Sequence, residues 1–398
     1  MGFGTVRIPV IQVITKLELG GAQQLALHIA RTMNRERFVP HLVCGQGGLL
    51  DQEAREDGRV PVWWVPHMLR EIRPQMDILA LWEIRRAIRQ ILLASGQGGL
   101  AIVHTHSSKA GILGRWAARL EGVPLIIHTY HGFGFHDWQT PMVRLVFQGI
   151  EQLTSRITHG LVMVSQANLV KAERCGIRPQ ILSRVIHGGI EIEKFRAARQ
   201  DARQKREELG LGEGDKIVSM VSCLKPQKAP VDFVSVAGKV ASQIPQAKFL
   251  LVGDGELRPQ VNMAVAQADL QGRFQHLGWR RDVASILGIT DVLVLTSLWE
   301  GFPLTLLQAM AAGVPAVVTR VDGSPEAILD GVNGFVLEPR DVEGMAARVV
   351  QLLRDPELRR KMGEEGRKRV QEFDIDEMVR KQEKFYLELV EAILERKN

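Results

Sequence analysis

The sequence predicts an α/β protein of two domains, each a parallel β-sheet covered by helices. Two observations carry this prediction. First, 398 residues exceed what one hydrophobic core comfortably holds, so two domains of similar size are expected. Second, short apolar runs of strand character alternate with helical stretches along the whole chain. Such alternation is typical of β-α-β units, in which helices connect parallel strands.

The expected strands form two series separated by a charged segment. The first series occupies residues 9–15 (beginning as early as residue 6), 40–44, 60–65, 101–105, 124–129, 160–165 and 184–187. The second occupies residues 216–222, 248–252, 274–277, 291–296 and 314–319. Residues 191–212, rich in Arg, Gln and Glu, follow a glycine turn and mark the join. The expected domains are therefore residues 1–195 and 196–376.

The composition excludes several classes of protein. With 45% hydrophobic and 24% charged residues, the chain is ordinary for a globular protein and unlike a disordered one. The three cysteines, Cys44, Cys175 and Cys223, lie far apart without metal-ligand spacing, which indicates reduced thiols. No run reaches the roughly 18 apolar residues of a membrane span. We expect a cytoplasmic protein.

The net charge of +6 is concentrated in the first half of the chain. Residues 1–195 hold 22 Lys/Arg against 15 Asp/Glu, whereas the remainder holds 29 against 30. No nucleic-acid module is recognisable, so nucleic acid is not an expected partner. An anionic membrane surface is the better candidate, with peripheral binding to the inner face of the plasma membrane. The arginine-bearing stretch 70–93 fits two interpretations, a helix lying on the membrane and a helix packed on the first sheet.

The most informative stretch, residues 297–326, contains two strand-to-helix turns. In the first turn, Pro303 can open a helix that Gly313 closes. In the second turn, residues 322–326 lead from a β-branched strand into a short helix. Parallel sheets bind ligands beyond the carboxyl ends of their strands, where helix N-termini offer N–H donors to phosphate. The side chains expected to line this crevice are Glu300, Gln308 and Glu326.

These residues resemble glycosyltransferase family 4, whose signature is a Glu, seven residues and a second Glu, followed by a Gly-Gly-x-x-Glu-like turn. Here the signature is Glu300 and Gln308, then Asp322-Gly323 and Glu326. The resemblance implies a GT-B fold, in which two Rossmann-like doubly wound domains face a central cleft. It implies transfer of a sugar from a nucleotide-sugar with retention of configuration. It also implies that the last helix, about residues 377–398, packs back on the first domain.

Further family motifs recur along the chain. Gly20-Gly21 follows the first strand and opens a helix, where glycine lets the backbone approach a phosphate. His131 matches the family's active-site His-Gly, which implies contact with the donor sugar. Lys228 matches the lysine that grips the donor diphosphate. The implied catalytic residues are His131 and Glu300, and the implied donor-binding residues are Gly20, Gly21, Lys228, Gln308, Glu326, Gly301, Phe302 and Pro303.

Two positions depart from the family's pattern. Cys223 stands where many members have arginine, so a bidentate guanidinium contact with phosphate is absent. Lys225 is a candidate for partial compensation. Gln308 stands where glutamate is usual, although its amide oxygen can still accept a hydrogen bond from a ribose hydroxyl.

No catalytic metal and no other cofactor are expected. His104 and His106 lie two apart at a probable strand end, without a nearby carboxylate pair to complete a metal site. His128 and His136 are expected to be structural. The sequence therefore predicts metal-independent chemistry.

The strongest resemblance is to bacterial enzymes that build capsular polysaccharide or exopolysaccharide. It implies a retaining hexosyltransferase of class EC 2.4 that uses a UDP- or GDP-sugar and a glycan or polyprenyl-phosphate-linked acceptor. Two alternatives remain, a nucleotide-sugar epimerase on the same fold and a non-catalytic nucleotide-sugar-binding subunit. Incubation with donor alone exposes epimerisation, and donor binding without transfer favours the second alternative.

Overall fold

The structure is a computed structural model that describes residues 7–96 and 99–396. Residue 6 of the first predicted strand and residues 397–398 of the last predicted helix lie outside the described residues. The chain forms two compact units. Unit 1 comprises the described residues up to Gly188 together with those from Asp376 onward, and unit 2 comprises Gly189–Ile375.

The segment that joins the two units differs from the expected position. The sequence prediction placed the join after residue 195, which lies within helix α7 (Ile192–Arg196). The Ile190 backbone nitrogen donates to the Phe373 carbonyl, and the Ile375 nitrogen donates to the Ile190 carbonyl. Because these bonds tie Ile190 to the end of unit 2, α7 belongs to unit 2.

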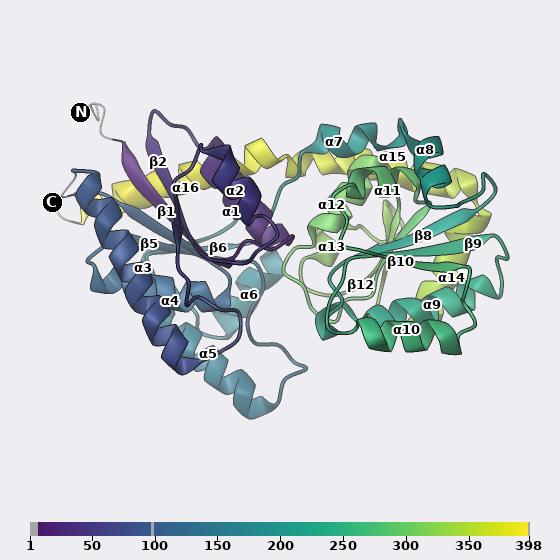
Figure 1. Ribbon diagram of the computed structural model, residues 1–398, viewed down its shortest axis with the longest axis horizontal. Coiled ribbons are helices and arrows are strands. Elements are labelled where there is room, and N and C mark those ends of the chain that lie inside the picture. The colour runs from purple at the N-terminus through teal and green to yellow at the C-terminus, as the bar shows by residue number, and fades with distance from the viewer. Residues whose placement is uncertain (1–6, 97–98, 397–398) are drawn as a thin grey trace. The chain divides into compact units, whose positions relative to one another are not determined.

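Unit 1 contains a parallel sheet that, within the described residues, has seven strands. Their order is β3-β2-β1-β4-β5-β6-β7, so the chain runs outward from β1 in one direction and from β4 in the other. Figure 1 labels β1, β2, β5 and β6 of this sheet. All seven predicted strands of the first half are confirmed. Their bounds are β1 (Ile8–Lys16), β2 (Phe38–Gly45), β3 (Val62–Trp64), β4 (Ile102–His106), β5 (Leu125–Tyr130), β6 (Gly160–Met163) and β7 (Leu182–Val185).

The helices of unit 1 cover both faces of this sheet. Ile84 of α3 and Ala117 of α4 share a core with Ile11 and Val103 on one face, whereas Leu27 of α1 packs with other strand residues. The bounds are α1 (Gly21–Thr32), α2 (Asp51–Asp57), α3 (Pro74–Ala94), α4 (Ser108–Leu120), α5 (Pro141–Ser155), α6 (Gln166–Arg174) and α16 (Ile375–Glu395).

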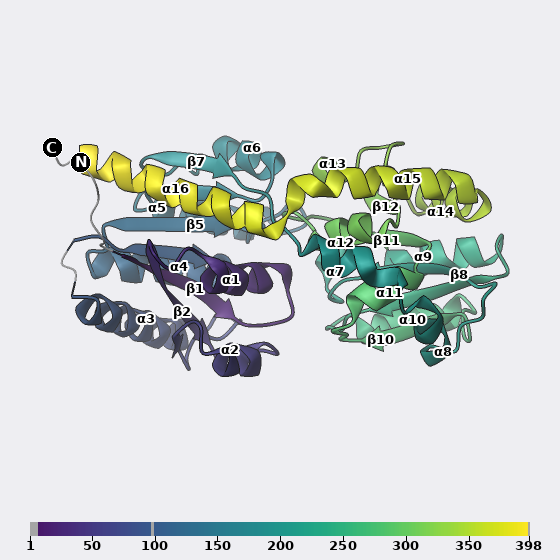
Figure 2. The same ribbon diagram turned by 90° about the horizontal axis from the view of Figure 1, so that it is seen from above.

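The C-terminal helix α16 lies against the unit 1 sheet, as Figure 2 shows in yellow. Phe385, Tyr386 and Leu389 are completely buried there. Gly160 of β6 permits this close approach, because a Cβ at that position would stand 2.4 Å from a Leu389 methyl group. The last helix is therefore part of the first unit's core.

The arginine-bearing stretch 70–93 forms most of α3, and one face of this helix packs as the second interpretation expected. Ile84, Ile88 and Ile91 are buried in the core of unit 1. Ile78 and Trp82, on the first half of the helix, remain exposed. Among the helices that the structure describes, none combines the length and apolar character needed to cross a bilayer.

Unit 2 repeats the architecture with strand order β10-β9-β8-β11-β12-β13. All of its paired strands are parallel. The five predicted strands are confirmed, and β13 was missed because it is a four-residue edge strand with a short apolar run. The bounds are β8 (Lys216–Val221), β9 (Ala247–Val252), β10 (Phe274–Gly278), β11 (Val292–Leu295), β12 (Ala316–Thr319) and β13 (Gly334–Leu337).

The helices of unit 2 connect these strands and complete both faces of the second sheet. Their bounds are α7 (Ile192–Arg196), α8 (Ala202–Glu208), α9 (Pro230–Ala241), α10 (Arg258–Gln267), α11 (Val283–Ile289), α12 (Leu304–Ala312), α13 (Ser324–Ala327), α14 (Val342–Arg354) and α15 (Pro356–Arg369). Three short 3-10 turns are η1 (Ala197–Arg199), η2 (Pro226–Lys228) and η3 (Val370–Phe373). The three cysteines of the chain are free thiols, as expected.

Both sheets reverse their strand order at a defined point, between β1 and β4 in unit 1 and between β8 and β11 in unit 2. In doubly wound sheets ligands bind beyond the carboxyl ends of the strands at this switch point. The candidate site residues lie in the segments that follow these four strands and the neighbouring strands β5 and β12.

Candidate active site

In unit 2, a charged pair lies at the switch point. Lys228 ends the turn after β8, and Glu300 lies in the loop after β11. The Lys228 ammonium donates to Oε1 of Glu300, and the two side chains are 16% and 4% exposed. Low exposure strengthens the attraction relative to that of a surface pair. The structure thus brings together two residues that the sequence placed in one site.

Three further residues hold the Glu300 carboxylate and its loop in place. The Ser297 hydroxyl donates to the same oxygen, Oε1, at 2.6 Å, and the Glu300 backbone nitrogen donates to Oδ2 of Asp322 at 2.7 Å. The Thr319 hydroxyl donates to the Ser297 carbonyl at 2.6 Å. The loops after β11 and β12 are therefore joined beside Glu300. Sequence reasoning did not identify Ser297 or Thr319.

The loop that carries Lys228 is joined to the β11 loop by bonds that do not involve its charge. The Thr296 hydroxyl donates to the carbonyls of Lys228 and Ala229 at 3.0 and 2.9 Å. The Leu298 nitrogen donates to the Gln227 carbonyl at 2.7 Å. The position of the lysine backbone is thus fixed even without the ion pair, so its ammonium can exchange partners without movement of the loop.

The structure confirms the predicted boundaries of α12. Pro303 directly precedes α12, and Gly313 ends it with a left-handed φ of 71°. Gly301 and Phe302 are buried, and the Phe302 ring packs 5.4 Å from that of Phe373. These apolar contacts fix the N-terminus of α12 beside the charged pair.

Two other predicted donor-binding residues lie on the neighbouring helices. Gln308 is on the second turn of α12 and Glu326 is on α13, and both are partly buried. The Gly323 nitrogen donates to the Gly301 carbonyl at 3.1 Å, which connects the turns that precede these helices. The structure therefore places Glu300, Gln308 and Glu326 on adjoining segments of unit 2.

In unit 1, a chain of buried side chains begins at His131, the residue after β5. Nε2 of His131 lies 2.9 Å from Nδ1 of His106, at the end of β4. Nε2 of His106 donates to Oε1 of Gln12, in β1, at 2.6 Å. Three strands thus contribute to the support of one partly buried imidazole.

The same series of hydrogen-bonded side chains continues into the C-terminal helix. Nε2 of Gln12 donates to the Tyr386 hydroxyl at 3.1 Å, and that hydroxyl lies 2.6 Å from Nδ1 of His104. Nε2 of His104 lies 2.7 Å from Oγ1 of Thr129. Gln12, His104, His106 and Tyr386 were absent from the predicted site. Alternation along β4 could have placed the two histidines on one face, but no local pattern connects them with Tyr386.

The direction of these hydrogen bonds fixes the tautomer of His131. The amide oxygen of Gln12 faces His106, so His106 carries its proton on Nε2 and its Nδ1 can only accept. The bond between His131 and His106 therefore requires a proton on Nε2 of His131. Nδ1 of His131 is left as a hydrogen-bond acceptor.

Burial keeps these imidazoles neutral. It lowers the pKa of His131 to about 4 and that of His104 to about 3, and it lowers the pKa of His106 well below its usual range. A buried imidazole loses hydration mainly in its charged form. At neutral pH this part of unit 1 consists of neutral hydrogen-bonding groups.

A strained residue joins β1 and β4 at the switch point of unit 1. Ser107 has φ 61° and ψ 159°, a backbone conformation that residues other than glycine rarely adopt. Its hydroxyl lies 2.7 Å from that of Thr15. Such backbone conformations cost on the order of 1–3 kcal/mol each and persist where the surroundings fix them. Ser107 directly follows His106, and sequence reasoning did not identify it.

Gly20 and Gly21 form the start of α1, after β1. Gly20 is the N-cap residue, and in this fully described helix no side chain caps the first turn and no acidic residue lies in it. The free N–H groups of such a turn favour an anion. A Cβ at Gly20 would meet only the flexible end of Gln23, so the fold itself tolerates a side chain there.

The other histidines considered from the sequence lie apart from this chain. His128 points to the opposite face of the sheet, where its Nδ1 lies 2.8 Å from the Thr105 hydroxyl. Within residues 7–96 and 99–396, no group of three or more His, Cys, Asp or Glu is placed to hold a metal ion. Metal independence stays a prediction.

Comparison with known proteins identifies the two halves of the chain. A sequence family described as "Glycosyltransferase Family 4" matches residues 19–194, and one described as "Glycosyl transferases group 1" matches residues 201–369. The chain is 32% identical over 376 residues to the Escherichia coli UDP-Gal:alpha-D-GlcNAc-diphosphoundecaprenol alpha-1,3-galactosyltransferase. That alignment covers 94% of this chain and 95% of the relative.

Solved structures agree with the topology over nearly the whole chain. Anabaena HepE in complex with UDP-glucose matches with a TM-score of 0.82 at 19% identity, over 96% of this chain and 100% of that chain. Sucrose-phosphate synthase from Thermosynechococcus elongatus matches with a TM-score of 0.81 at 20% identity, over 97% and 100%. At these identities the likeness establishes the fold alone, which is GT-B.

Proposed function

The chain belongs to glycosyltransferase family 4, and we propose that it moves a sugar from a UDP-sugar to a hydroxyl of a polyprenyl-diphosphate-linked glycan, with retention of configuration. One observation carries this proposal. Full-length identity of 32% connects the chain with a relative whose name specifies a UDP-sugar donor and a diphosphoundecaprenol-linked acceptor. We place the reaction in the assembly of cell-surface polysaccharide, capsule included.

The charged pair of unit 2 supports binding of the donor diphosphate. Lys228 already neutralises one carboxylate oxygen, and its backbone is fixed by Thr296. In the proposed complex the ammonium turns to the diphosphate, and Glu300 accepts hydrogen bonds from sugar hydroxyls. In unit 1, the uncapped N-terminus of α1 after Gly20 offers N–H donors of the kind that suit a phosphate. Gln308 accepts a hydrogen bond from the ribose, and Glu326 completes the set.

The neutral, hydrogen-bonded side chains around His131 in unit 1 support recognition of the sugar by hydrogen bonds rather than by charge. Nδ1 of His131 is an acceptor, held in one orientation by the bond from its Nε2 to His106. We assign it a sugar hydroxyl. Because burial holds the pKa of His131 at about 4, the imidazole keeps this role throughout the neutral range.

The proposed reaction needs no nucleophile from the enzyme. The bond between the anomeric carbon and the β-phosphate oxygen breaks, and the bond to the acceptor oxygen forms on the same face. The acceptor proton passes to the departing diphosphate oxygen. Lys228 stabilises charge that develops on this leaving group, which lowers the barrier because the stabilisation is greatest in the transition state.

A two-stage experiment tests this function. Thermal-shift screening of UDP- and GDP-sugars identifies the donor, because a ligand that binds the native state raises its melting temperature. Transfer to a short-chain prenyl-diphosphate glycan is then followed by NMR of the new anomeric proton, with a chelator in a parallel reaction. We expect a UDP-sugar, a retained configuration and no effect of the chelator.

Two controls separate this function from its alternatives. Donor incubated without acceptor reveals an epimerase by a change in the sugar ring. A donor that raises the melting temperature but yields neither transfer nor hydrolysis would indicate a binding subunit instead. An inverted product would contradict the proposed chemistry while leaving the donor assignment intact.

A further inference from the structure

Helix α5 of unit 1 carries its apolar side chains on the outside. These residues recur at the helical period and form one stripe, as the apolar face of an amphipathic helix does, yet this stripe faces water. Trp138, in the loop just before the helix, is 47% exposed. We call the stripe the α5 face, and its members are Met142 (78% exposed), Leu145 (63%), Val146 (56%), Ile150 (38%) and Leu153 (52%).

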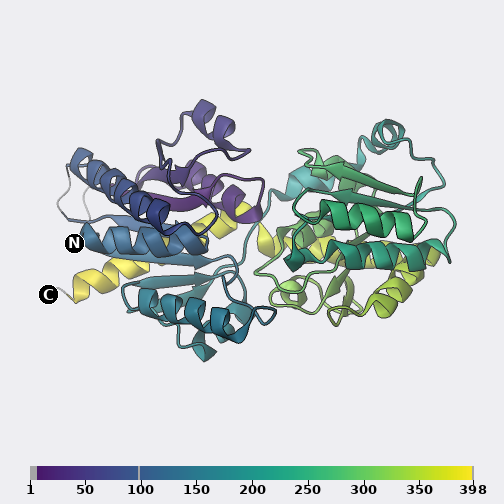
Figure 3. The ribbon, with the colours of Figure 1, turned by 60° about the horizontal axis from the view of Figure 1, so that its bottom comes forward.

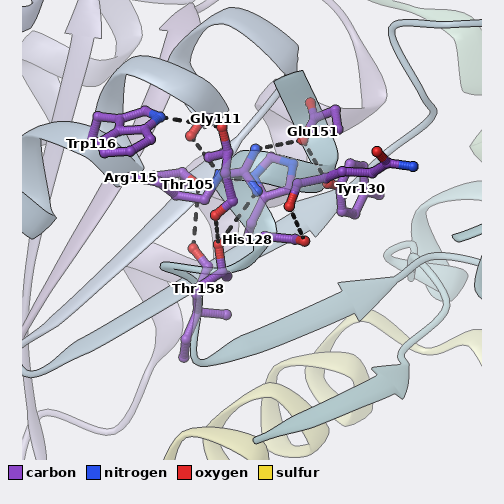
Figure 4. Close-up of polar contacts among 12 residues, drawn as sticks. Thr105, Gly111, Arg115, Trp116, His128, Tyr130, Glu151 and Thr158 are labelled. Carbon is purple, nitrogen blue, oxygen red and sulfur yellow. Dashed lines mark hydrogen bonds and ion pairs between the residues drawn. The ribbon is translucent and has the colours of Figure 1, made fainter. Parts of the chain in front are cut away.

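The buried side of α5 is polar. Oε2 of Glu151 accepts hydrogen bonds from Nη2 of Arg115 at 2.7 Å and from the Tyr130 hydroxyl at 2.6 Å (Figure 4). Nε1 of Trp116 donates to Oγ1 of Thr154 at 3.2 Å. The helix thus binds the rest of unit 1 through an ion pair and hydrogen bonds, together with the partly buried ring of Phe147. Its fully buried residues are polar, whereas its most exposed ones are apolar.

This polar anchorage prevents the helix from rolling its apolar face inward. Burial is the largest single influence on the pKa of the Arg115 guanidinium and lowers it, but Glu151 and Tyr130 together outweigh burial and raise this pKa. Rotation of α5 would leave the buried Arg115 charge without its carboxylate partner and the Tyr130 hydroxyl without its acceptor. Removing one member of a buried ion pair is strongly destabilising. The outward direction of the α5 face is therefore built into the core.

The surroundings of the α5 face are basic. Residues 137–180 contain three acidic side chains, Asp137, Glu151 and Glu173. Asp137 pairs with Arg144, and Glu151 is the buried partner of Arg115. The same segment carries five basic residues, Arg144, Arg156, Lys171, Arg174 and Arg178. A second copy of this chain on the α5 face would bring basic residues against basic residues. An apolar partner with anionic groups at its surface fits better.

The α5 face belongs to a layer that has other exposed apolar residues. Helices α3, α4 and α5 lie side by side on one face of the unit 1 sheet (Figure 3), and α4 contacts both of its neighbours. On α3, Ile78 and Trp82 are each 59% exposed. The loop that starts at His131 leads directly into α5, so the α5 face lies close in sequence to the proposed sugar contact.

We propose that the α5 face inserts into the interface of an anionic lipid bilayer, with the neighbouring arginines and lysines at the headgroups. The inference rests on the proposed function in one respect, because a lipid-linked acceptor would be presented at such a surface. Large exposed apolar patches mark interaction sites, and a helix with a basic surround and an apolar face binds anionic membranes in the interfacial plane. This assigns membrane docking to α5 rather than to the arginines of α3.

Vesicle co-sedimentation of the full chain tests the proposal. Phosphatidylcholine vesicles with and without phosphatidylglycerol are compared at low and high salt, because screening weakens headgroup attraction. The test variant carries Leu145→Gln and Val146→Gln. A matched control carries Met263→Gln and Val332→Gln, two equally accessible apolar positions of unit 2. We expect the first pair to weaken partitioning at least about tenfold and the second to leave it unchanged.

The outcomes decide the proposal. All four positions are exposed, so both variants should melt as the wild type does, which excludes misfolding as the cause. Wild-type-like binding by the Leu145→Gln, Val146→Gln variant overturns the proposal, as does binding indifferent to phosphatidylglycerol. A concentration-dependent dimer that this variant abolishes, without vesicle binding by the wild type, would instead identify a second copy as the partner.

A further measurement separates this inference from the proposed function. Transfer to a short-chain, water-soluble acceptor should be the same in the variant and the wild type, whereas transfer to a long-chain acceptor in vesicles should fall with partitioning. Vesicle binding by a wild-type protein that transfers no sugar would contradict the proposed function and still support the docking surface. Equal loss of both transfer reactions in the variant would overturn the docking role.

Discussion

The two units share a topology but place different chemistry at their switch points. Unit 1 joins neutral imidazoles, a glutamine and a tyrosine in one series of hydrogen-bonded side chains that begins at His131. Unit 2 holds an ion pair, Lys228 with Glu300, on loops fixed by neutral bonds. One sheet therefore presents oriented hydrogen-bonding groups and the other presents charge. The same fold can serve a sugar hydroxyl or a diphosphate, and the loop residues decide which.

The contrast rests on burial as much as on residue type. The buried histidines of unit 1 lie deep enough that their protonation is strongly opposed, whereas the charged lysine of unit 2 lies against a carboxylate. Changes of pH should therefore act on unit 1, and changes of charged side chains on unit 2.

Acid should destabilise unit 1 before unit 2. Of the 11 histidines, only His276 lies in unit 2. The folded-state pKa values of His41 and His131 are about 4, below the unfolded value near 6.5. Below pH 6.5 the unfolded chain binds more protons, so stability present above that pH is lost as the pH falls towards 4. Each such imidazole accounts for at most roughly 3 kcal/mol of this loss.

Hydrogen exchange of the full chain at pH 7 and pH 5, corrected for intrinsic rates, measures this difference. Peptides from β4 and β5 should lose protection, and those from β8 and β11 should keep it. If the unit 2 peptides open first, the acid sensitivity does not come from the buried imidazoles.

Glu300→Gln should cut the rate of transfer at least about a hundredfold, because a carboxylate beside the developing positive charge of the sugar acts mainly in the transition state. Binding of UDP should stay the same or tighten, since Lys228 loses its competing partner. Initial rates and calorimetry with UDP measure the two effects. Glu338→Gln, at a surface ion pair of the same unit, is the control. Near-normal turnover in the Glu300 variant would remove this residue from the site.

Lys228→Ala should weaken UDP binding about tenfold, a smaller loss than a bare lysine–phosphate contact would give, because the free protein already pairs this ammonium. Calorimetry compares it with Lys239→Ala, which removes a surface lysine of the same unit. In a double variant with Glu300→Gln the two effects should not add, since the side chains touch. Unchanged affinity in the single variant would make Lys228 a structural partner of Glu300.

The sequence predicted every described strand except β13, and the boundaries of α12, because these features depend on local patterns. The resemblance to the family placed Lys228 and Glu300 in one site. It did not predict Ser297 or Thr319, whose hydroxyls act through loop geometry that no spacing reveals. The reversed polarity of α5 was also missed. Its apolar residues have ordinary helical spacing, and only the buried pair of Arg115 and Glu151 shows which face is inside.

Sequence reasoning failed most clearly for the support of His131. His104 and His106 were rejected as metal ligands and given no other role, whereas in the structure their ring nitrogens lie against Gln12, Thr129, His131 and Tyr386. The residue that completes the chain, Tyr386, is 282 positions from His104. A contact over such a distance in the chain follows from the packing of α16 on the sheet, which depends on the whole fold.

Tyr386→Phe should have the smallest effect, roughly a threefold to fivefold fall in kcat/KM for transfer with unchanged UDP affinity. Loss of the hydroxyl leaves the Gln12 amide nitrogen and Nδ1 of His104 without partners, so the amide can reverse and change the tautomer of His131. The control is Ser219→Ala, which removes a buried hydroxyl 2.8 Å from that of Thr290 in unit 2. Both variants should lose about 1–3 kcal/mol of stability, but only Tyr386→Phe should slow transfer and shift the imidazole nitrogen NMR signals of His131. Two results would contradict this role: a loss of rate in proportion to the loss of stability in both variants, or unchanged His131 signals. The hydrogen-bonded side chains would then support the fold alone, and the loop after β5 would orient His131.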